Sequence, residues 1–144
     1  MFCLWPQVMH GNRYRLRSAS NIADEIQWVL EKWPGIREGE FFFEDDTFTV
    51  NTARAHQICD EILRRRITCT WSVNSRADVL DQDLFRHMKE AGCRLVLTGF
   101  ESGSDMMLER MNKRVNVDTM KKFIRIVKKA GLDIHGCFVL GLLA

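Results

Sequence analysis

A glutamate stands at the end of a short apolar run near the middle of the chain, with small residues on both sides. The segment 99–104 reads Gly-Phe-Glu-Ser-Gly-Ser and follows the apolar residues 95–97. A carboxylate at Glu101 is poorly placed for packing and well placed to accept hydrogen bonds from the hydroxyl groups of a ligand. A simple turn capped by Ser102 or Ser104 is the alternative interpretation.

Three other strand-like runs also end in polar or small residues. Ligands of parallel α/β proteins bind at the carboxyl ends of the strands, so residues at these ends form candidate sites. The alternative is that loops between strands and helices are polar in any protein. The residues at these ends are Asp45 and Asp46, then Asn74 and Arg76, and finally Gly141.

Helices and strands alternate along the sequence that carries these residues. Apolar residues recur at helical spacing in five segments, and four short runs have strand-like composition. Ser20 or Asn21 can cap the first helix, and Asn51 can cap the second. The expected helices are 20–33, 51–63, 81–91, 106–111 and 117–130, and the expected strands are 41–43, 67–73, 94–98 and 134–140.

This alternation predicts an α/β fold with a parallel sheet and crossover helices. A doubly wound sheet and a (β/α) barrel both fit the order of the elements. The run 41–43 consists of three phenylalanines, which is typical of a strand covered on both faces.

The bulk composition is that of one folded domain, residues 1–144. Hydrophobic residues make up 46% and charged residues 28% of the chain, which excludes extensive disorder. The net charge of +2 does not favour a nucleic-acid partner, and we interpret the arginine cluster 64–66 as a solvated helix face. No apolar run approaches the ~20 residues of a membrane span. No signal peptide is visible, so we expect a cytoplasmic protein.

Five cysteines form neither a metal knuckle nor a disulfide framework by their spacing. Cys59 and Cys69 lie in an apolar helix face and a strand-like run, so we expect them to be small core residues. Cys93 precedes a strand and is open to the same interpretation. Cys3 differs, because it lies in an opening loop directly after an aromatic residue. The remaining cysteine is Cys137.

The pair Phe2-Cys3 resembles the end of the Cys-x-x-x-Cys-x-aromatic-Cys loop of the radical S-adenosylmethionine (radical SAM) superfamily. The segment 42–48, Phe-Phe-Glu-Asp-Asp-Thr-Phe, is similar to a strand end of its cobalamin-dependent members. The most specific match is Gly-x-Glu-Ser at 99–102. The opening Cys-Leu-Trp-Pro-Gln, residues 3–7, is similar to proteins of hopanoid biosynthesis within that group.

The resemblance implies a partial (β/α)₆ barrel of the TIM type, truncated at both ends. This chain would run from the end of the cluster loop through the fifth barrel strand. The family reductively cleaves S-adenosylmethionine at a [4Fe–4S] cluster to make a 5′-deoxyadenosyl radical. The implied partners are a small-molecule substrate, which is a lipid in the hopanoid case, a reductant such as flavodoxin or ferredoxin, and cobalamin in the full-length parent.

The resemblance also assigns roles to individual residues. Phe2 and Cys3 would belong to the cluster loop, with Cys3 as a metal ligand. Asp45 and Asp46 would accept from the amino group of the cofactor's methionine part. Arg76 would pair with its carboxylate, although pairing with Asp78 or Asp81 is an equally good interpretation. Glu101 and Ser102 would lie near the ribose and methionyl parts, and Gly141 would end the strand that contacts adenine.

One cysteine cannot hold a [4Fe–4S] cluster, which needs three thiolates in this family. The second cysteine of the motif would fall before Met1, so we expect no cluster-dependent turnover from this polypeptide alone. An open half-barrel that lacks part of its own sheet leaves unpaired strand edges, so we also expect self-association. The alternatives are a cluster-less, inactive barrel remnant and a cofactor-free βα enzyme. The latter needs a catalytic lysine or a phosphate loop, and neither is evident.

Overall fold

Four parallel strands form one sheet in the computed structural model, which describes residues 15–141. Each strand pairs in parallel with the next strand along the chain, so the order in the sheet equals the order in the sequence. The strands are β1 (Glu40–Phe43), β2 (Thr70–Asn74), β3 (Cys93–Glu101) and β4 (Asp133–Phe138).

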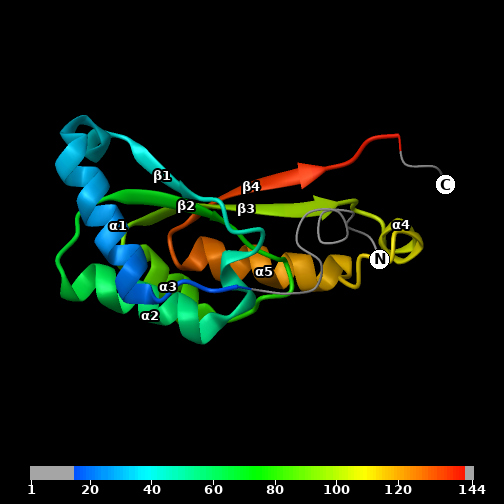
Figure 1. Cartoon of the computed structure of the whole chain (residues 1–144). Coiled ribbons are helices and arrows are strands. Elements are labelled where there is room, and N and C mark those ends of the chain that lie inside the picture. Colours follow the sequence, from blue (N-terminus) through cyan, green and yellow to red (C-terminus); the bar gives the residue numbers. More distant parts are fainter. Residues whose placement is uncertain (1–14, 142–144) are drawn as a thin grey trace.

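The long helices that connect these strands lie together on one side of the sheet (Figure 1). Two short 3₁₀ helices, η2 (Pro34–Glu38) and η3 (Phe48–Val50), were not expected from the sequence. No helix within residues 15–141 has the length and apolar character needed to cross a membrane. The α-helices are α1 (Ala19–Lys32), α2 (Thr52–Arg64), α3 (Gln82–Glu90), α4 (Asp105–Arg110) and α5 (Val117–Lys129).

The strand order distinguishes between the two folds that the sequence left open. A doubly wound sheet reverses its strand order at a switch point and carries helices on both faces. Here the order is sequential, and Figure 1 shows α2, α3 and α5 on the same face of the sheet. The arrangement is therefore part of a (β/α) barrel, as expected.

The hydrophobic core lies between the sheet and these helices. Trp71 and Val73 of β2 are fully buried there, together with Phe85 of α3 and Phe123 of α5. The indole nitrogen of Trp71 donates to the carbonyl oxygen of Ala91 at 2.7 Å, so this large side chain is buried without an unsatisfied donor. Cys59, Cys69 and Cys93 are also buried, which confirms their expected place in the core.

Strand β1 differs from the expectation of a strand covered on both faces. Its burial alternates, and Phe42 is 39% exposed. Phe41 and Phe43 pack against the core, and the ring of Phe43 contacts Trp71 at 5.3 Å between centroids. The difference arises because the helices of the described chain cover only one face of the sheet (Figure 1).

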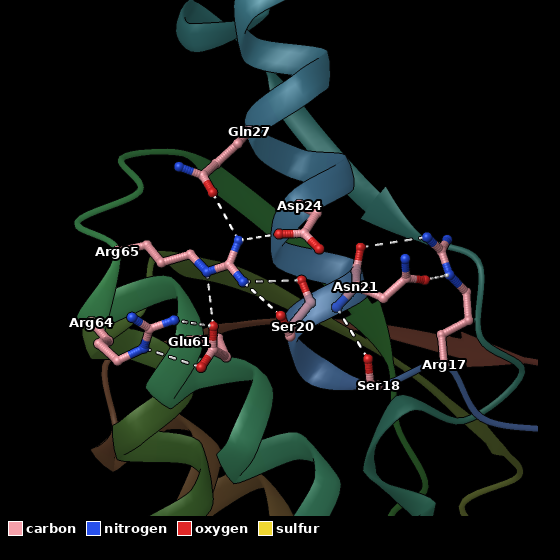
Figure 2. Close-up of polar contacts among 9 residues, drawn as sticks. All are labelled: Arg17, Ser18, Ser20, Asn21, Asp24, Gln27, Glu61, Arg64 and Arg65. Carbon is pink, nitrogen blue, oxygen red and sulfur yellow. Dashed lines mark hydrogen bonds and ion pairs between the residues drawn. The ribbon is translucent and has the colours of Figure 1, made fainter.

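Arg65 ties helix α1 to the end of helix α2 (Figure 2). Its guanidinium donates to Asp24 at 2.5 Å, to Gln27 at 2.9 Å and to the Ser20 hydroxyl at 2.8 Å, all on α1. It also donates to Glu61 of its own helix at 2.8 Å. The interpretation of cluster 64–66 as a solvated face is thus wrong for Arg65, whose side chain is only 13% exposed.

The helix ends agree with the sequence in most places. Asn51 caps α2 as expected, and its side chain accepts from the backbone N–H of Arg54. Helix α1 is capped by Ser18 rather than by Ser20 or Asn21, so it begins earlier than expected. Strand β2 begins at Thr70 rather than at residue 67. The reason is that Arg66, with φ of 54°, first closes the end of α2 in a left-handed conformation.

Candidate functional site

The carboxyl ends of the four strands lie side by side and carry most of the predicted site residues. At the first two ends, the Asn74 side chain donates to the carbonyl oxygen of Asp45 at 3.2 Å. Between the second and third strands, the Thr98 hydroxyl donates to the carbonyl oxygen of Ser75 at 2.7 Å. Contacts between neighbouring ends therefore join the loops into one continuous rim. We call it the strand-end rim, and it consists of segments 44–46, 74–76, 99–104 and 138–141.

Glu101 lies at the third of these ends and is the most enclosed acid of the rim. Its side chain is 14% exposed, and its carboxylate oxygen Oε1 accepts from the Lys113 ammonium at 3.0 Å. Its carbonyl oxygen accepts from the backbone N–H of Val139 at 3.0 Å, which holds the end of β4 beside it. A carboxylate in this position has acceptor capacity beyond the single bond from Lys113.

Ser102 takes part in the local turn. Its hydroxyl oxygen accepts from the backbone N–H of Ser104 at 3.2 Å. The turn capped by Ser102, which was the alternative interpretation of this segment, is therefore present. The same segment also holds the enclosed Glu101 carboxylate. Strand β4 ends at Phe138 and not at residue 140 as expected, so Gly141 lies in the segment after the strand. Gly141 is exposed and has φ of 77°, a left-handed conformation that favours glycine.

Asp45 and Asp46 differ in their surroundings. Asp45 is half-buried, and its Oδ1 lies 3.8 Å from Nη1 of Arg54 on helix α2. Asp46 is exposed, and its carbonyl oxygen accepts from the Thr47 hydroxyl. Asp45 therefore already has a cationic neighbour, and a ligand ammonium group would share its carboxylate with Arg54.

Arg54 was not expected at the site, although the sequence holds a signal for it. It lies four residues before Ile58 and so falls on the buried face of helix α2. Its side chain is 9% exposed, and Nη1 has no hydrogen-bond partner within the described chain. Arg54 and Asp45 also line a cavity of about 470 Å³ between α1 and β1, which is a separate space from the surroundings of Glu101.

Arg76 pairs with Asp78 in this structure, which is one of the two interpretations left open by the sequence. Its Nε and Nη2 donate to the two carboxylate oxygens at 2.9 Å and 2.5 Å, a bidentate geometry. These hydrogen bonds lower the pKa of Asp78 and raise that of Arg76. Contact between Arg76 and a ligand carboxylate stays a prediction, and it requires Arg76 to exchange or share this partner.

The predicted cluster residues Phe2 and Cys3 lie outside the described residues. Within residues 15–141, no group of three or more histidine, cysteine or acidic side chains is placed to hold a metal. Burial raises the pKa of the Cys59 thiol to about 12, as is typical of an inert structural cysteine in apolar surroundings. The described residues therefore do not themselves fit a [4Fe–4S] cluster.

Comparison with known families and curated proteins gives matches along nearly the whole chain. The family model of the Radical SAM superfamily matches residues 1–143. An uncharacterized methyltransferase of Pyrococcus horikoshii is 33% identical over 141 residues, which cover 98% of this chain and 30% of that protein. The anaerobic magnesium-protoporphyrin IX monomethyl ester cyclase of Rubrivivax gelatinosus is 29% identical, with 90% and 23% covered. Hopanoid C-3 methylase of Methylococcus capsulatus is more distant, at 24% identity with 88% and 24% covered.

The chain spans less than a third of the length of each of these relatives. A solved structure, the cobalamin-dependent S-adenosylmethionine radical enzyme OxsB with aqua-cobalamin and S-adenosylmethionine bound, matches with a TM-score of 0.80. The match covers 88% of this chain and 20% of OxsB at 19% identity. This likeness confirms the partial-barrel fold and carries no residue roles to the present chain.

Proposed function

The chain belongs to the radical SAM superfamily, and we propose that its strand-end rim binds S-adenosylmethionine as part of a larger radical enzyme. The observation that carries the proposal is the Glu101 carboxylate, which is enclosed at the carboxyl end of β3 and has acceptor capacity for a ligand. Ionised carboxylates accept hydrogen bonds from ribose hydroxyl groups. A rim of this kind at the carboxyl ends of parallel strands is also where ligands of barrel proteins bind.

Each rim residue has a proposed part in holding the ligand. Glu101 accepts from the ribose hydroxyls, and Ser102 lies next to it in the same turn. Asp45 and Asp46 accept from the amino group of the methionine part, and Arg76 approaches its carboxylate. Gly141, in the segment after β4, lies near the adenine, and the space around it is open, since a Cβ there would meet no atom within 4 Å.

The reaction of the whole protein is a further part of the proposal. In the parent enzyme, a [4Fe–4S] cluster would supply one electron to cleave S-adenosylmethionine into methionine and a 5′-deoxyadenosyl radical, and this radical would abstract a hydrogen atom from a small-molecule substrate. The named relatives include methyltransferases and a cyclase, so the superfamily membership alone does not select one outcome. Cobalamin and a lipid substrate are favoured by the likeness to OxsB and to the hopanoid methylase, and a hopanoid role rests on the more distant of these relatives.

Binding can be tested on the 144-residue chain with S-adenosylhomocysteine as the probe. We expect the amide chemical shifts that change during a titration into the millimolar range to gather on the strand-end rim. Glu101→Gln should weaken binding roughly tenfold, because hydrogen bonds to a charged acceptor contribute about 1.5–3 kcal/mol. Glu109→Gln is the matched control, since Glu109 is exposed on helix α4. Shift changes away from the rim, or equal affinity of Glu101→Gln and the unaltered chain, would contradict the proposal.

A further inference from the structure

Glu101 and Lys113 form a largely enclosed ion pair at the rim. The Lys113 ammonium lies 3.0 Å from Oε1 of Glu101, and the two side chains are 18% and 14% exposed. Arg76 and Asp78, by comparison, are 50% and 37% exposed. Enclosed charge pairs are screened less by solvent than exposed pairs, so this contact has more influence on where its carboxylate lies.

The backbone at Glu101 turns the carboxylate toward Lys113. Glu101 has φ of 65°, and the N–H of Ser102 donates to the carbonyl oxygen of Phe100 at 2.8 Å, which is the pattern of a γ-turn. The pairing of β3 with β4 shifts register at the same place, between Gly99 and Glu101. Such a conformation is costly for a residue other than glycine, and strained backbone of this kind is typical of functional sites.

Gly99 provides the space that the ion pair occupies. A Cβ at this position would lie 2.2 Å from Oε1 of Glu101 and 3.3 Å from the Lys113 nitrogen. The first distance is far below van der Waals contact, so no other residue fits here without moving the Glu101 carboxylate. Gly99 therefore leaves the space in which Glu101 and Lys113 form their ion pair.

Lys113 is held from its own side by the end of helix α4. Its backbone N–H donates to the carbonyl oxygen of Leu108 at 2.9 Å, and the preceding Asn112 has φ of 55°, which together form a Schellman motif. The loop is fixed again where the Asp105 carboxylate accepts from the N–H of Val117 at 2.7 Å. The lysine thus enters the rim from a loop that is tied at both ends.

We propose that Lys113 is a positioning residue, which holds the Glu101 carboxylate in the orientation that reads the ribose hydroxyls of the ligand. Oε1 accepts from Lys113, which leaves Oε2 to accept from a ribose hydroxyl. The inference rests on the proposed function, because it concerns how the same rim selects its ligand. The inference goes beyond the proposed function, because it assigns the selectivity for a ribose to a residue in the loop after α4.

The test compares S-adenosylhomocysteine with its 2′,3′-dideoxyribose analogue. For the unaltered chain we expect the dideoxy analogue to bind roughly tenfold more weakly, because it offers no hydroxyl to Glu101. Lys113→Met should bring the two affinities to within about twofold and leave the affinity for the dideoxy analogue unchanged. Lys113→Arg should restore part of the difference in affinity between the two compounds. Lys121→Met is the matched control on the exposed surface of α5 and should behave as the unaltered chain.

The outcomes separate the two proposals. If the unaltered chain binds neither compound at the rim, the proposed function fails, and the role of Lys113 fails with it. If the unaltered chain prefers the ribose and Lys113→Met keeps that preference, the positioning role alone is overturned. If Lys113→Met weakens both compounds equally, Lys113 has a general structural role and the inference is also overturned. Amide spectra of each variant verify that it is folded.

Discussion

Gly99 is the residue on which the placement of the Glu101 carboxylate depends. A methyl group at this position would lie 2.2 Å from Oε1 of Glu101, so Gly99→Ala must displace that carboxylate. We expect the variant to lose the preference for a ribose in the same titrations. The atoms that the methyl group meets are the ends of flexible side chains, which can move aside, so we expect the free energy of unfolding to fall by less than about 1 kcal/mol. Urea unfolding followed by circular dichroism measures the second effect.

Gly103 provides the control in the same loop. A Cβ at Gly103 would meet no atom within 4 Å, so Gly103→Ala should change the free energy of unfolding by less than about 0.5 kcal/mol. It should also leave the ribose preference intact. If Gly99→Ala and Gly103→Ala show the same ribose preference, the space at Gly99 does not determine the position of Glu101.

Single residues of the site were predictable from the sequence to different degrees. Glu101 could be predicted as a site residue because it stands at the end of an apolar run. The pairing of Asp78 with Arg76 could be predicted as one of two alternatives, because the two residues are near in sequence. Lys113 was not assigned as the partner of Glu101, because their contact depends on a γ-turn and a Schellman loop, and neither has a periodic pattern.

At the scale of elements, Arg65 determines how helix α1 lies against helix α2. Arg64 and Arg65 both donate to Glu61, but only Arg65 also contacts α1, through Asp24, Gln27 and Ser20 (Figure 2). We therefore expect Arg65→Met to lower the urea midpoint more than Arg64→Met does. Amide hydrogen exchange in α1 should accelerate only in Arg65→Met.

Arg64→Met is a close control because the side chain of Arg64 is 65% exposed and shares the same acceptor. The loss of the contact with Glu61 is common to both variants and cancels in the comparison. The remaining difference reports the contacts with α1. Equal midpoints for the two variants would mean that these contacts do not stabilise the packing of the two helices.

The existence of the elements was easier to predict than their limits. Asn51 was correctly placed at a helix end, because a polar cap has a clear local signal. The start of β2 was wrong by three residues, since Arg66 adopts the conformation that the sequence would lead one to expect of glycine. The alternating burial of β1 could not be foreseen from three phenylalanines, because it depends on which face of the sheet the helices cover.

At the scale of the whole molecule, the described sheet has two open edges and one uncovered face. Strands β1 and β4 are its outermost strands, and α2, α3 and α5 lie together on one face of the sheet (Figure 1). Phe42 on β1 is 39% exposed and Phe138 on β4 is 61% exposed. Unpaired strands that carry exposed apolar side chains are sites of association between chains.

We therefore expect the isolated 144-residue chain to self-associate through these edges. Sedimentation velocity over a range of concentrations should show the average mass rising above that of the monomer. Replacing both Phe42 and Phe138 with lysine should reduce the association, because charges on edge strands oppose pairing. Met106→Lys is the control, since Met106 is 56% exposed on helix α4 and lies on neither edge strand. A monodisperse monomer at all concentrations would contradict the expectation, and an equal reduction by Met106→Lys would place the association elsewhere on the surface.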